Sequence, residues 1–273
     1  MDPENLNKEQ RKAYKLQRKF EKEQARLRKN DTANSTLAIT ESVANILCVR
    51  FGNKYPISYV EKLRNMIKRN ITVPYKLYCL TDDPHTIDGV ELIVQKNAGY
   101  VKGWWHKVHM FDPKLPLSGR ILYMDLDVVI SGNLDKLTQI SGNTFMGIRD
   151  FNRKFHKDWK YLNSSVMSWI HGTQSHIYTQ FMNNPQTAQR MHGDQDWTWK
   201  CAKDRIKFWP EPWIQSYKWE IRDRSELQVI QGIRQFTSIR NDIEIPTECS
   251  IAVFHGSPNP EIVQDKFVVD NWK

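Results

Sequence analysis

Short apolar runs recur along the chain from about residue 45 onward, separated by polar stretches and by stretches with helical spacing. The runs are rich in Val, Ile, Leu and Tyr, which favour β-strands, and turn-forming residues bound most of them. We therefore predict strands at residues 45–49, 75–80, 90–94, 121–130, 144–147, 164–170 and 250–254. The strand at 121–130 is the longest and most apolar of these.

The stretch after the first strand has the spacing of an amphipathic helix. Val60, Leu63 and Ile67 recur at intervals of three and four residues, so they share one face. Ser58 and Glu61 have the spacing of a capping box, which predicts that the helix begins there.

A second helix is expected at residues 104–111. Trp104, Val108 and Phe111 form its core-facing stripe. Lys107 lies next to this stripe. It therefore either points into the edge of a cleft, where it would offset phosphate charge, or lies in solvent, as most lysines do.

The alternation of strands and helices predicts an α/β fold with a single, Rossmann-like, mostly parallel sheet flanked by helices. The chain contains neither GxGxxG, the motif of Rossmann dinucleotide-binding proteins, nor GxxxxGK[ST], the P-loop motif. Both of these nucleotide-binding classes therefore lose their main support. The chain also lacks HExxH, so it does not have this zinc-protease motif.

The N-terminal segment differs in composition from the rest of the chain. Residues 5–29 lack Gly and Pro and are rich in Glu, Lys, Gln, Arg and Ala, which favours a helix. Residues 1–31 contain ten Lys or Arg and six Asp or Glu, a net +4 of the chain's +9. We predict a basic helical extension and linker at 1–37 and a folded domain at 38–273. The extension is solvated, bound to an anionic membrane surface through residues 1–35, or paired with another chain.

Other features of the composition predict a cytoplasmic protein, free or peripheral at a membrane. No apolar run approaches the roughly 20 residues that span a bilayer, and the N-terminus has no apolar signal region. The four cysteines are far apart and form no CxxC pair, so we expect reduced, mostly buried thiols. The positive charge suits an anionic partner, for which a nucleotide diphosphate or an acidic membrane is expected, rather than a nucleic acid.

Two carboxylates end the first half of the strongest predicted strand. Asp125 and Asp127 are one residue apart and follow the apolar residues 121–124. Ligands bind at the carboxyl ends of strands in open α/β sheets, and Mn²⁺ or Mg²⁺ prefers oxygen ligands and commonly bridges to phosphate. We therefore predict a divalent metal site here.

Three further segments offer side chains or backbone groups for a ligand. His255 and Gly256 follow the strand at 250–254, where an imidazole can be a third metal ligand and a glycine admits a phosphate to the backbone. Asp194 and Gln195 precede an expected helix, so Asp194 is either an N-cap or, with Gln195, a sugar contact. Asn163, Ser164 and Ser165 open a strand at the sheet edge and offer an amide and two hydroxyls for sugar hydroxyls.

Taken in order, these segments resemble the family 8 glycosyltransferases, the group that contains glycogenin and bacterial lipopolysaccharide galactosyltransferases. The resemblance spans residues 44–260 and rests on Tyr55, Lys107, Tyr-Met-Asp-Leu-Asp (123–127), Leu-Asn-Ser-Ser-Val-Met (162–167), Gly-Asp-Gln (193–195) and His-Gly-Ser-Pro-Asn-Pro (255–260). It implies a GT-A fold and a hexosyltransferase that moves a sugar from a nucleotide-diphosphate donor, usually UDP, with Mn²⁺ and with retention at the anomeric carbon.

The resemblance also implies a role for each matched residue. The metal ligands would be Asp125, Asp127 and His255. The donor contacts would be Lys107 and Gly256 at the diphosphate, Asn163, Asp194 and Gln195 at the sugar, and Tyr55 beside the uracil. The acceptor, which is a carbohydrate, lipid or protein, is not readable from the residues.

One position departs from the pattern of the resemblance. The family commonly has Lys where this chain has Asn259. A phosphate contact is therefore missing or is supplied from elsewhere, for which Lys218 is the candidate.

Two other function classes remain open. In a haloacid-dehalogenase-type phosphatase, Asp125 would be the nucleophile and Asp127 the acid or base. That nucleophile normally follows the first strand of its domain, whereas roughly 80 residues of the predicted domain precede Asp125. The other alternative is a non-catalytic nucleotide-sugar-binding protein, which only Asn259 favours.

Overall fold

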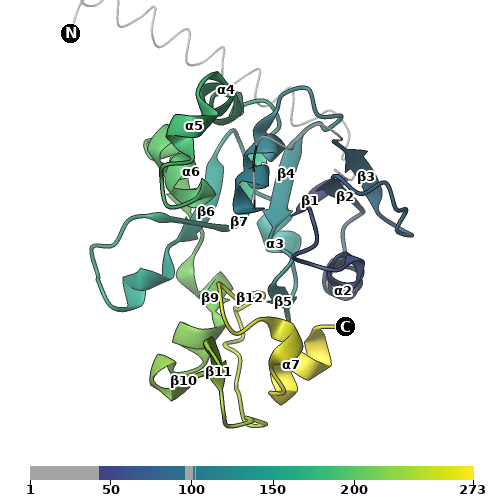
Figure 1. The fold of residues 1–273 in the computed structure, drawn as a ribbon. Helices are drawn as coiled ribbons and strands as arrows, with labels where there is room; N and C mark the ends of the chain where they lie inside the picture. The colour runs from purple at the N-terminus through teal and green to yellow at the C-terminus, as the bar shows by residue number, and fades with distance from the viewer. Residues whose placement is uncertain (1–42, 96–100, 102) are drawn as a thin grey trace, which may run out of the picture. The chain divides into compact units, whose positions relative to one another are not determined.

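The computed structural model describes residues 43–95, 101 and 103–273 (Figure 1). The predicted basic helix, its linker and the boundary near residue 38 lie outside this part of the chain. Within it, every strand expected from the sequence is present to within a few residues, except that one is divided in two.

A mixed, mostly parallel sheet forms the centre of the fold, as predicted. Its seven strands have the order β3-β2-β1-β4-β7-β6-β8. Only β7 runs against its neighbours β4 and β6, so the other strands all point the same way. The strands are β1 (Ala44–Arg50), β2 (Tyr75–Thr81), β3 (Glu91–Val94), β4 (Arg120–Met124), β6 (Phe145–Arg149), β7 (Leu162–Ile170) and β8 (Ile206–Phe208).

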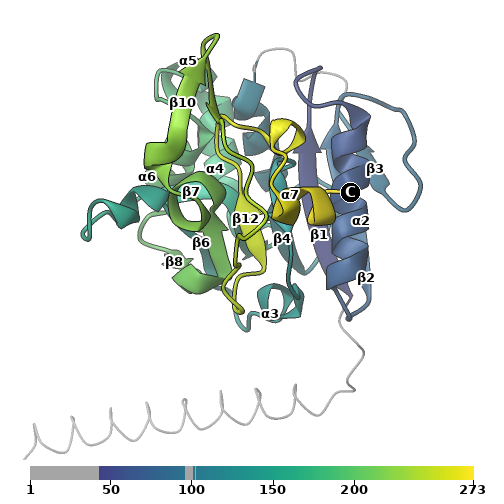
Figure 2. The same cartoon turned by 90° about the horizontal axis from the view of Figure 1, so that it is seen from below.

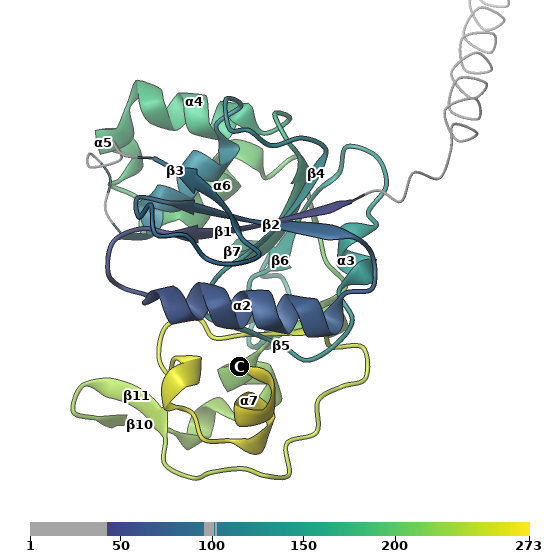
Figure 3. The ribbon, with the colours of Figure 1, turned by 90° about the vertical axis from the view of Figure 1, so that its right-hand side faces the viewer.

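Helices cover both faces of this sheet (Figure 3). Alternate residues of β1 point to opposite sides, so Ile46 and Cys48 join the core under α2 while Leu47 joins the core under α4 and α6. The helices are α2 (Ile57–Asn70), α3 (Asp135–Thr138), α4 (Ser175–Asn183), α5 (Pro185–Ala188), α6 (Asp194–Ala202) and α7 (Lys266–Asn271). The 3₁₀ and π turns are η2 (Gly103–Phe111), η3 (Phe151–Lys154), η4 (Glu211–Trp213), η5 (Tyr217–Ile221), η6 (Arg224–Glu226) and η7 (Pro260–Ile262).

The expected strand at 121–130 is two strands in two sheets. β4 ends at Met124, and β5 (Val128–Ile130) pairs with β12 (Ile251–Val253) in a small sheet of order β5-β12-β9, where β9 is Ile214–Ser216. The whole run is apolar because the chain stays buried as it passes from one sheet to the other. The crossing consists of Asp125, Leu126 and Asp127.

The predicted start of the first helix is wrong, although its buried face is confirmed. Pro56 precedes α2 with extended backbone, and no side chain caps the helix. Ser58 lies within the first turn of α2, so it cannot cap it. The fixed φ of proline and its missing N–H suit the start of a helix without a capping side chain.

The predicted stripe of the second helix is confirmed at Val108 and Phe111 and wrong at Trp104. Trp105, rather than Trp104, is buried with Val108 and Phe111, and Trp104 is 56% exposed. The segment η2 is a 3₁₀ helix, in which residues three apart share a face. Residues 105, 108 and 111 have this spacing.

Residues 205–245, where the sequence predicted no element, contain β8, β9 and a separate hairpin. The hairpin pairs β10 (Leu227–Ile230) antiparallel to β11 (Ile233–Phe236). Across the described part of the chain, no helix is both long and apolar enough to cross a membrane. All four cysteines are free, and three of them are buried, as expected.

Candidate active site

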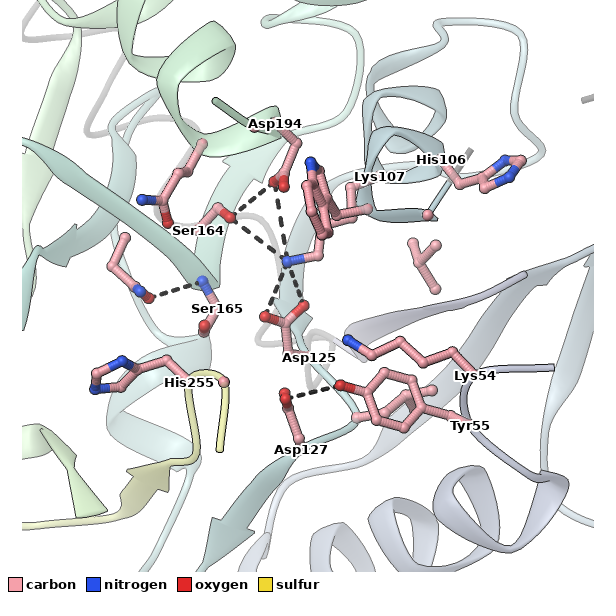
Figure 4. Close-up of a pocket in the computed structure, with 18 of the residues that line it drawn as sticks. Lys54, Tyr55, His106, Lys107, Asp125, Asp127, Ser164, Ser165, Asp194 and His255 are labelled. Carbon is pink, nitrogen blue, oxygen red and sulfur yellow. Dashed lines mark hydrogen bonds and ion pairs between the residues drawn. The ribbon is translucent and has the colours of Figure 1, made fainter. Parts of the chain in front are cut away.

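A pocket of about 380 Å³ opens at the carboxyl ends of the central strands (Figure 4). Of the residues singled out from the sequence as ligand contacts, all but Lys218 line it: Tyr55, Lys107, Asp125, Asp127, Asn163, Asp194, Gln195, His255 and Gly256. They come from the loop after β1, η2, the β4–β5 crossing, β7, the start of α6 and the turn after β12. The fold therefore brings Tyr55 and Gly256, which are 201 positions apart in the sequence, into one site.

Lys107 faces two carboxylates and does not lie in solvent. Its Nζ is 2.6 Å from Asp125 Oδ1 and 3.9 Å from Asp194 Oδ2. Burial works against the charge on Lys107, but Asp125 and Asp194 outweigh it and raise the pKa of Lys107 above its usual range. The ammonium group thus remains charged inside the pocket.

Asp127 has a neutral partner. Tyr55 donates a hydrogen bond to Asp127 Oδ2 at 2.8 Å (Figure 4). Burial, together with repulsion from Asp125, raises the pKa of Asp127 to about 6. Two carboxylates one residue apart therefore share a pocket in which only Asp125 is paired with a cation.

Asp194 is the first residue of α6, and Gly193 precedes the helix in extended conformation, so Asp194 is not the N-cap. Its Oδ2 accepts a hydrogen bond from Ser164 Oγ at 2.8 Å. Burial raises the pKa of Asp194, while Lys107 opposes this shift. Asp194 is therefore a buried acid that closes one side of the pocket.

Asn163 is buried on β7, one residue before Ser164. Its Oδ1 accepts a hydrogen bond from Ser165 N at 3.1 Å, which orients the amide. Ser164 and Ser165 also line the pocket. The structure therefore places at the pocket the amide and both hydroxyl side chains that the sequence offered in this run.

His255 is held away from the carboxylates. Its ring is stacked on Phe151 with centroids 5.0 Å apart, and its Nε2 is 2.7 Å from Ser216 Oγ. Figure 4 shows the imidazole pointing away from Asp125 and Asp127. Burial, followed by the charge of Lys218, lowers the pKa of His255 to about 3, so the ring is neutral.

These contacts test how well the predicted metal site fits. The oxygens of Asp125 and Asp127 suit Mn²⁺ or Mg²⁺, and a dication would offset the repulsion that raises the pKa of Asp127. In the described part of the chain, however, no three His, Cys, Asp or Glu side chains are grouped closely enough to hold a metal ion. The two carboxylates fit the ion, and His255 would join them only after its ring leaves Ser216.

Lys218 is tied to the turn that follows β12 and does not line the pocket. Its Nζ donates to the backbone carbonyls of His255 and Ser257. Gly256 lies between these carbonyls with φ of +73°, and a Cβ there would be 3.5 Å from Lys218 Nζ. Burial, with repulsion from two arginines, lowers the pKa of Lys218 to about 8.

Several pocket residues were missed by the sequence reasoning. Phe51 and His106 stack in parallel with ring centroids 4.3 Å apart, and Lys54 lies over the Tyr55 ring at 4.7 Å. Trp104, expected in the core, also lines the pocket. The signal available for Lys54 was its place in the loop after a buried strand, which is where ligands bind in such sheets.

Solved structures with the same architecture are glycosyltransferases. The galactosyltransferase LgtC, in complex with donor and acceptor sugar analogues, matches with a TM-score of 0.56 and 10% identity, over 84% of this chain and 96% of LgtC. The glycosyltransferase GlyE of Streptococcus pneumoniae TIGR4 matches with a TM-score of 0.50 and 17% identity, over 62% of this chain and 46% of GlyE. This chain therefore spans about half the length of GlyE.

The chain has the GT-A fold. This confirms at the level of fold the resemblance to family 8 glycosyltransferases. No protein-family model matches the chain, and no curated protein matches its sequence. In this GT-A fold, the crossing between β4 and β5 places both Asp125 and Asp127 at the pocket.

Proposed function

We propose that the chain is a metal-dependent glycosyltransferase that moves a sugar from a nucleotide-diphosphate donor to an acceptor hydroxyl. The observation that carries this proposal is the meeting of Asp125, Asp127 and Lys107 in one pocket of a GT-A fold. The pocket offers carboxylates for a divalent cation, an ammonium for phosphate, and hydroxyl and amide groups for a sugar. That combination suits a ligand with an anionic half and a hydroxyl-rich half.

The chemical problem in such a transfer is the leaving group. As the bond from the anomeric carbon to the diphosphate breaks, negative charge grows on the diphosphate oxygens. A bound Mn²⁺ or Mg²⁺, held by Asp125 and Asp127, would supply positive charge at this point. Lys107 adds a second positive charge that its buried position keeps from being screened by water.

The groups on β7 and α6 are suited to the sugar. Asn163, Ser164, Asp194 and Gln195 line the pocket, and together they present donors and acceptors for hydroxyl groups. At the turn after β12, the positive φ of Gly256 keeps the backbone open to a phosphate. The donor would therefore lie across the β4–β5 crossing, with its sugar toward α6.

The finer assignments rest on the resemblance stated above. It favours UDP as the nucleotide, a hexose as the sugar, and retention at the anomeric carbon. It places Tyr55 beside the base, and the hydrogen bond from Tyr55 to Asp127 keeps this ring at the edge of the same pocket. The acceptor is a carbohydrate, a lipid or a protein.

A donor screen tests this function. The full chain is incubated with Mn²⁺ and individual nucleotide sugars, and release of the nucleoside diphosphate is measured by chromatography. We expect release from at least one UDP-sugar, loss of release with EDTA, and loss with Asp127→Ala. If no nucleotide sugar is bound or hydrolysed by the folded chain, the proposal is wrong.

The same protein preparation distinguishes the proposed glycosyltransferase from the phosphatase alternative. A phosphatase that uses Asp125 as nucleophile would turn over phosphomonoesters without a nucleotide sugar and would be inhibited by beryllium fluoride. The buried ion pair of Asp125 with Lys107 leaves this carboxylate less free to attack phosphorus. We therefore expect no phosphomonoester turnover.

A further inference from the structure

The hairpin β10–β11 exposes apolar side chains that the fold does not use. Val229 is 68% exposed, Ile230 39% and Ile233 49%. The two strands pair only with each other, so the hairpin tip belongs to neither of the larger sheets. Contiguous apolar groups left in water on a folded domain commonly mark a surface that meets a partner.

The exposed apolar surface continues toward the base of the hairpin. Ile239 and Ile262 are 63% and 45% exposed, and both border a small hollow that also contains Phe236 of β11. Of the twelve large hydrophobic side chains that are exposed in the described part of the chain, these two and the three at the tip make five. The concentration in one region distinguishes this surface from scattered exposed residues.

The base of the hairpin is firmly anchored, which makes the exposed tip a stable feature. The Arg222 guanidinium lies over the Phe236 ring at 4.0 Å and pairs with Asp265 at 2.6 Å. Phe236 also meets the Tyr217 ring edge-on at 5.9 Å. At the tip, Gln231 and Gly232 both have positive φ, as in the tight turns that suit two-residue hairpins.

Two arginines that pair with no carboxylate of the described residues lie at the hairpin, whereas the acid that precedes β10, Glu226, is paired with Arg222 and Arg240. Arg234 is the only charged residue of the hairpin strands, and it lies opposite Val229. Arg224 precedes the hairpin in η6. Among the residues that the structure describes, no carboxylate forms an ion pair with either arginine.

The surface stands beside the opening of the pocket. Arg234 and Arg224 lie close enough to Lys218 to lower its pKa, and Lys218 binds the carbonyl of His255, which lines the pocket. Figures 2 and 3 both show the hairpin projecting on the same side as the loop between β1 and α2, which carries Tyr55. A partner that covers the hairpin would therefore lie next to the pocket.

We propose that the hairpin tip, made of Val229, Ile230 and Ile233 with Arg224 and Arg234 behind it, docks on an anionic lipid bilayer. A narrow, projecting tip suits the bilayer interface, where apolar side chains enter the acyl region while cations remain among the phosphates. This proposal does not depend on the proposed catalytic function.

Vesicle binding by the full chain tests the proposal. Co-sedimentation is measured with phosphatidylcholine vesicles and with vesicles that contain phosphatidylglycerol as well, at low and high salt. The tip variant carries Val229→Thr, Ile230→Thr and Ile233→Thr, which keeps β-branched side chains at all three strand positions. The matched control carries Val43→Thr, Val94→Thr and Val269→Thr, which removes three exposed apolar groups elsewhere.

We expect the chain to bind the anionic vesicles and the tip variant to lose at least tenfold in partition coefficient, about 1.4 kcal/mol. The control should bind as the unaltered chain does. Arg224→Gln and Arg234→Gln should each weaken binding about fivefold at low salt. Their effect should disappear at high salt, while the effect of the tip variant remains.

Three results would overturn the proposal. The first is that the unaltered chain binds neither kind of vesicle. The second is that the tip variant binds as well as the control. The third is that light scattering shows a dimer which the tip variant dissociates, with no change in vesicle binding, because the tip would then contact a second copy of the chain. Circular dichroism and the melting temperature verify that each variant is folded.

Discussion

Tyr55 donates a hydrogen bond to Asp127 across 72 positions of the sequence, joining the loop after β1 to the crossing between β4 and β5. Because the phenol is neutral, it holds the carboxylate in place without cancelling its charge. Asp125, the first residue of the same crossing, is paired instead with the ammonium of Lys107. The two acids of the motif therefore differ in electrostatic environment, and the first predictions follow from this difference.

Removing the Tyr55 hydroxyl should make Asp127 harder to ionise. The hydrogen bond from Tyr55 stabilises the charged form, so Tyr55→Phe should raise the pKa of Asp127 further above 6. We expect Mn²⁺ affinity at pH 6.5 to fall several-fold in this variant and to recover by pH 8.5. Isothermal calorimetry with Mn²⁺ and UDP at the two pH values measures this. An equal loss at both would show that the hydroxyl acts on the donor and not on Asp127.

Neutralising Asp127 should stabilise the fold while it abolishes transfer. The pKa of Asp127 is 3.8 as a free group and about 6 in the folded chain, so the folded state binds this proton more tightly. The ionised carboxylate consequently destabilises the fold above pH 6, and the penalty is relieved as the pH falls from 6 toward 4. Asp127→Asn should therefore raise stability at pH 7.5 by roughly 1–3 kcal/mol and should have little effect at pH 4.

Thermal unfolding at several pH values checks this prediction. A gain of about 1 kcal/mol corresponds to a rise of roughly 2–4 °C for a domain of this size. Asp158→Asn, at an exposed position of the loop before β7, is the control and should leave the melting temperature unchanged. A loss of stability in Asp127→Asn at pH 7.5 would contradict the conclusion that the ionised Asp127 carboxylate destabilises the fold.

Breaking the buried pair at Lys107 should cost much more than breaking a surface pair. Lys107→Met leaves Asp125 and Asp194 facing each other without a cation, and removal of one partner of a buried pair typically costs about 3–5 kcal/mol. Adding Asp125→Asn to Lys107→Met should restore much of this stability, because a charge that lacked a partner is removed. It should not restore donor hydrolysis.

Urea denaturation and UDP release, measured on the two single variants and the double variant, form the test. Additive losses of stability would show that Lys107 and Asp125 do not interact energetically, contrary to the 2.6 Å contact. Recovery of hydrolysis in the double variant would mean that neither residue contributes to transfer.

Freeing His255 from Ser216 should strengthen metal binding. The ring nitrogen that faces Ser216 would have to leave this contact to reach a cation held by the two carboxylates. Because a hydrogen bond contributes about 1 kcal/mol net, Ser216→Ala should tighten Mn²⁺ binding about fivefold if His255 is the third ligand. Ser216 also accepts from Trp219 N, so the melting temperature is measured in parallel.

The double variant Ser216→Ala, His255→Ala is the control for this effect. It should bind Mn²⁺ no more tightly than His255→Ala alone, because the nitrogen released by the first change is absent. Tightening of equal size in both backgrounds would assign the effect to the cavity left by Ser216, and His255 would then not be a ligand.

The location of the pocket could be predicted because local patterns point to one edge of the sheet. Asp125, Asp194 and His255 each adjoin an apolar run or an expected helix, and the ends of parallel strands meet at a common edge. The direction in which a side chain points was harder to predict from the sequence. Trp104 was placed in the core because the spacing was read with a helical period of 3.6, whereas η2 has the tighter 3₁₀ period that buries Trp105 instead.

The pattern of apolar residues along the chain also cannot predict which strands pair. The apolar run at 121–130 has the same composition on both sides of Asp125, and only the partners available in space separate β4 from β5. The segment at 205–245 carries weak local signals because its strands are short and partly exposed. The hairpin in it was therefore not expected.

The sequence by itself determined the α/β class, the succession of strands and the residue types gathered for an anionic ligand, because burial and periodicity are local properties of the chain. Only the tertiary structure decided which charges meet. It paired Lys107 with Asp125, placed Tyr55 on Asp127 and turned His255 toward Ser216, and the electrostatics of the pocket follow from these contacts. The physical reason is that a pKa depends on burial and on charges within a few ångströms, and those neighbours come from parts of the chain that only folding brings together.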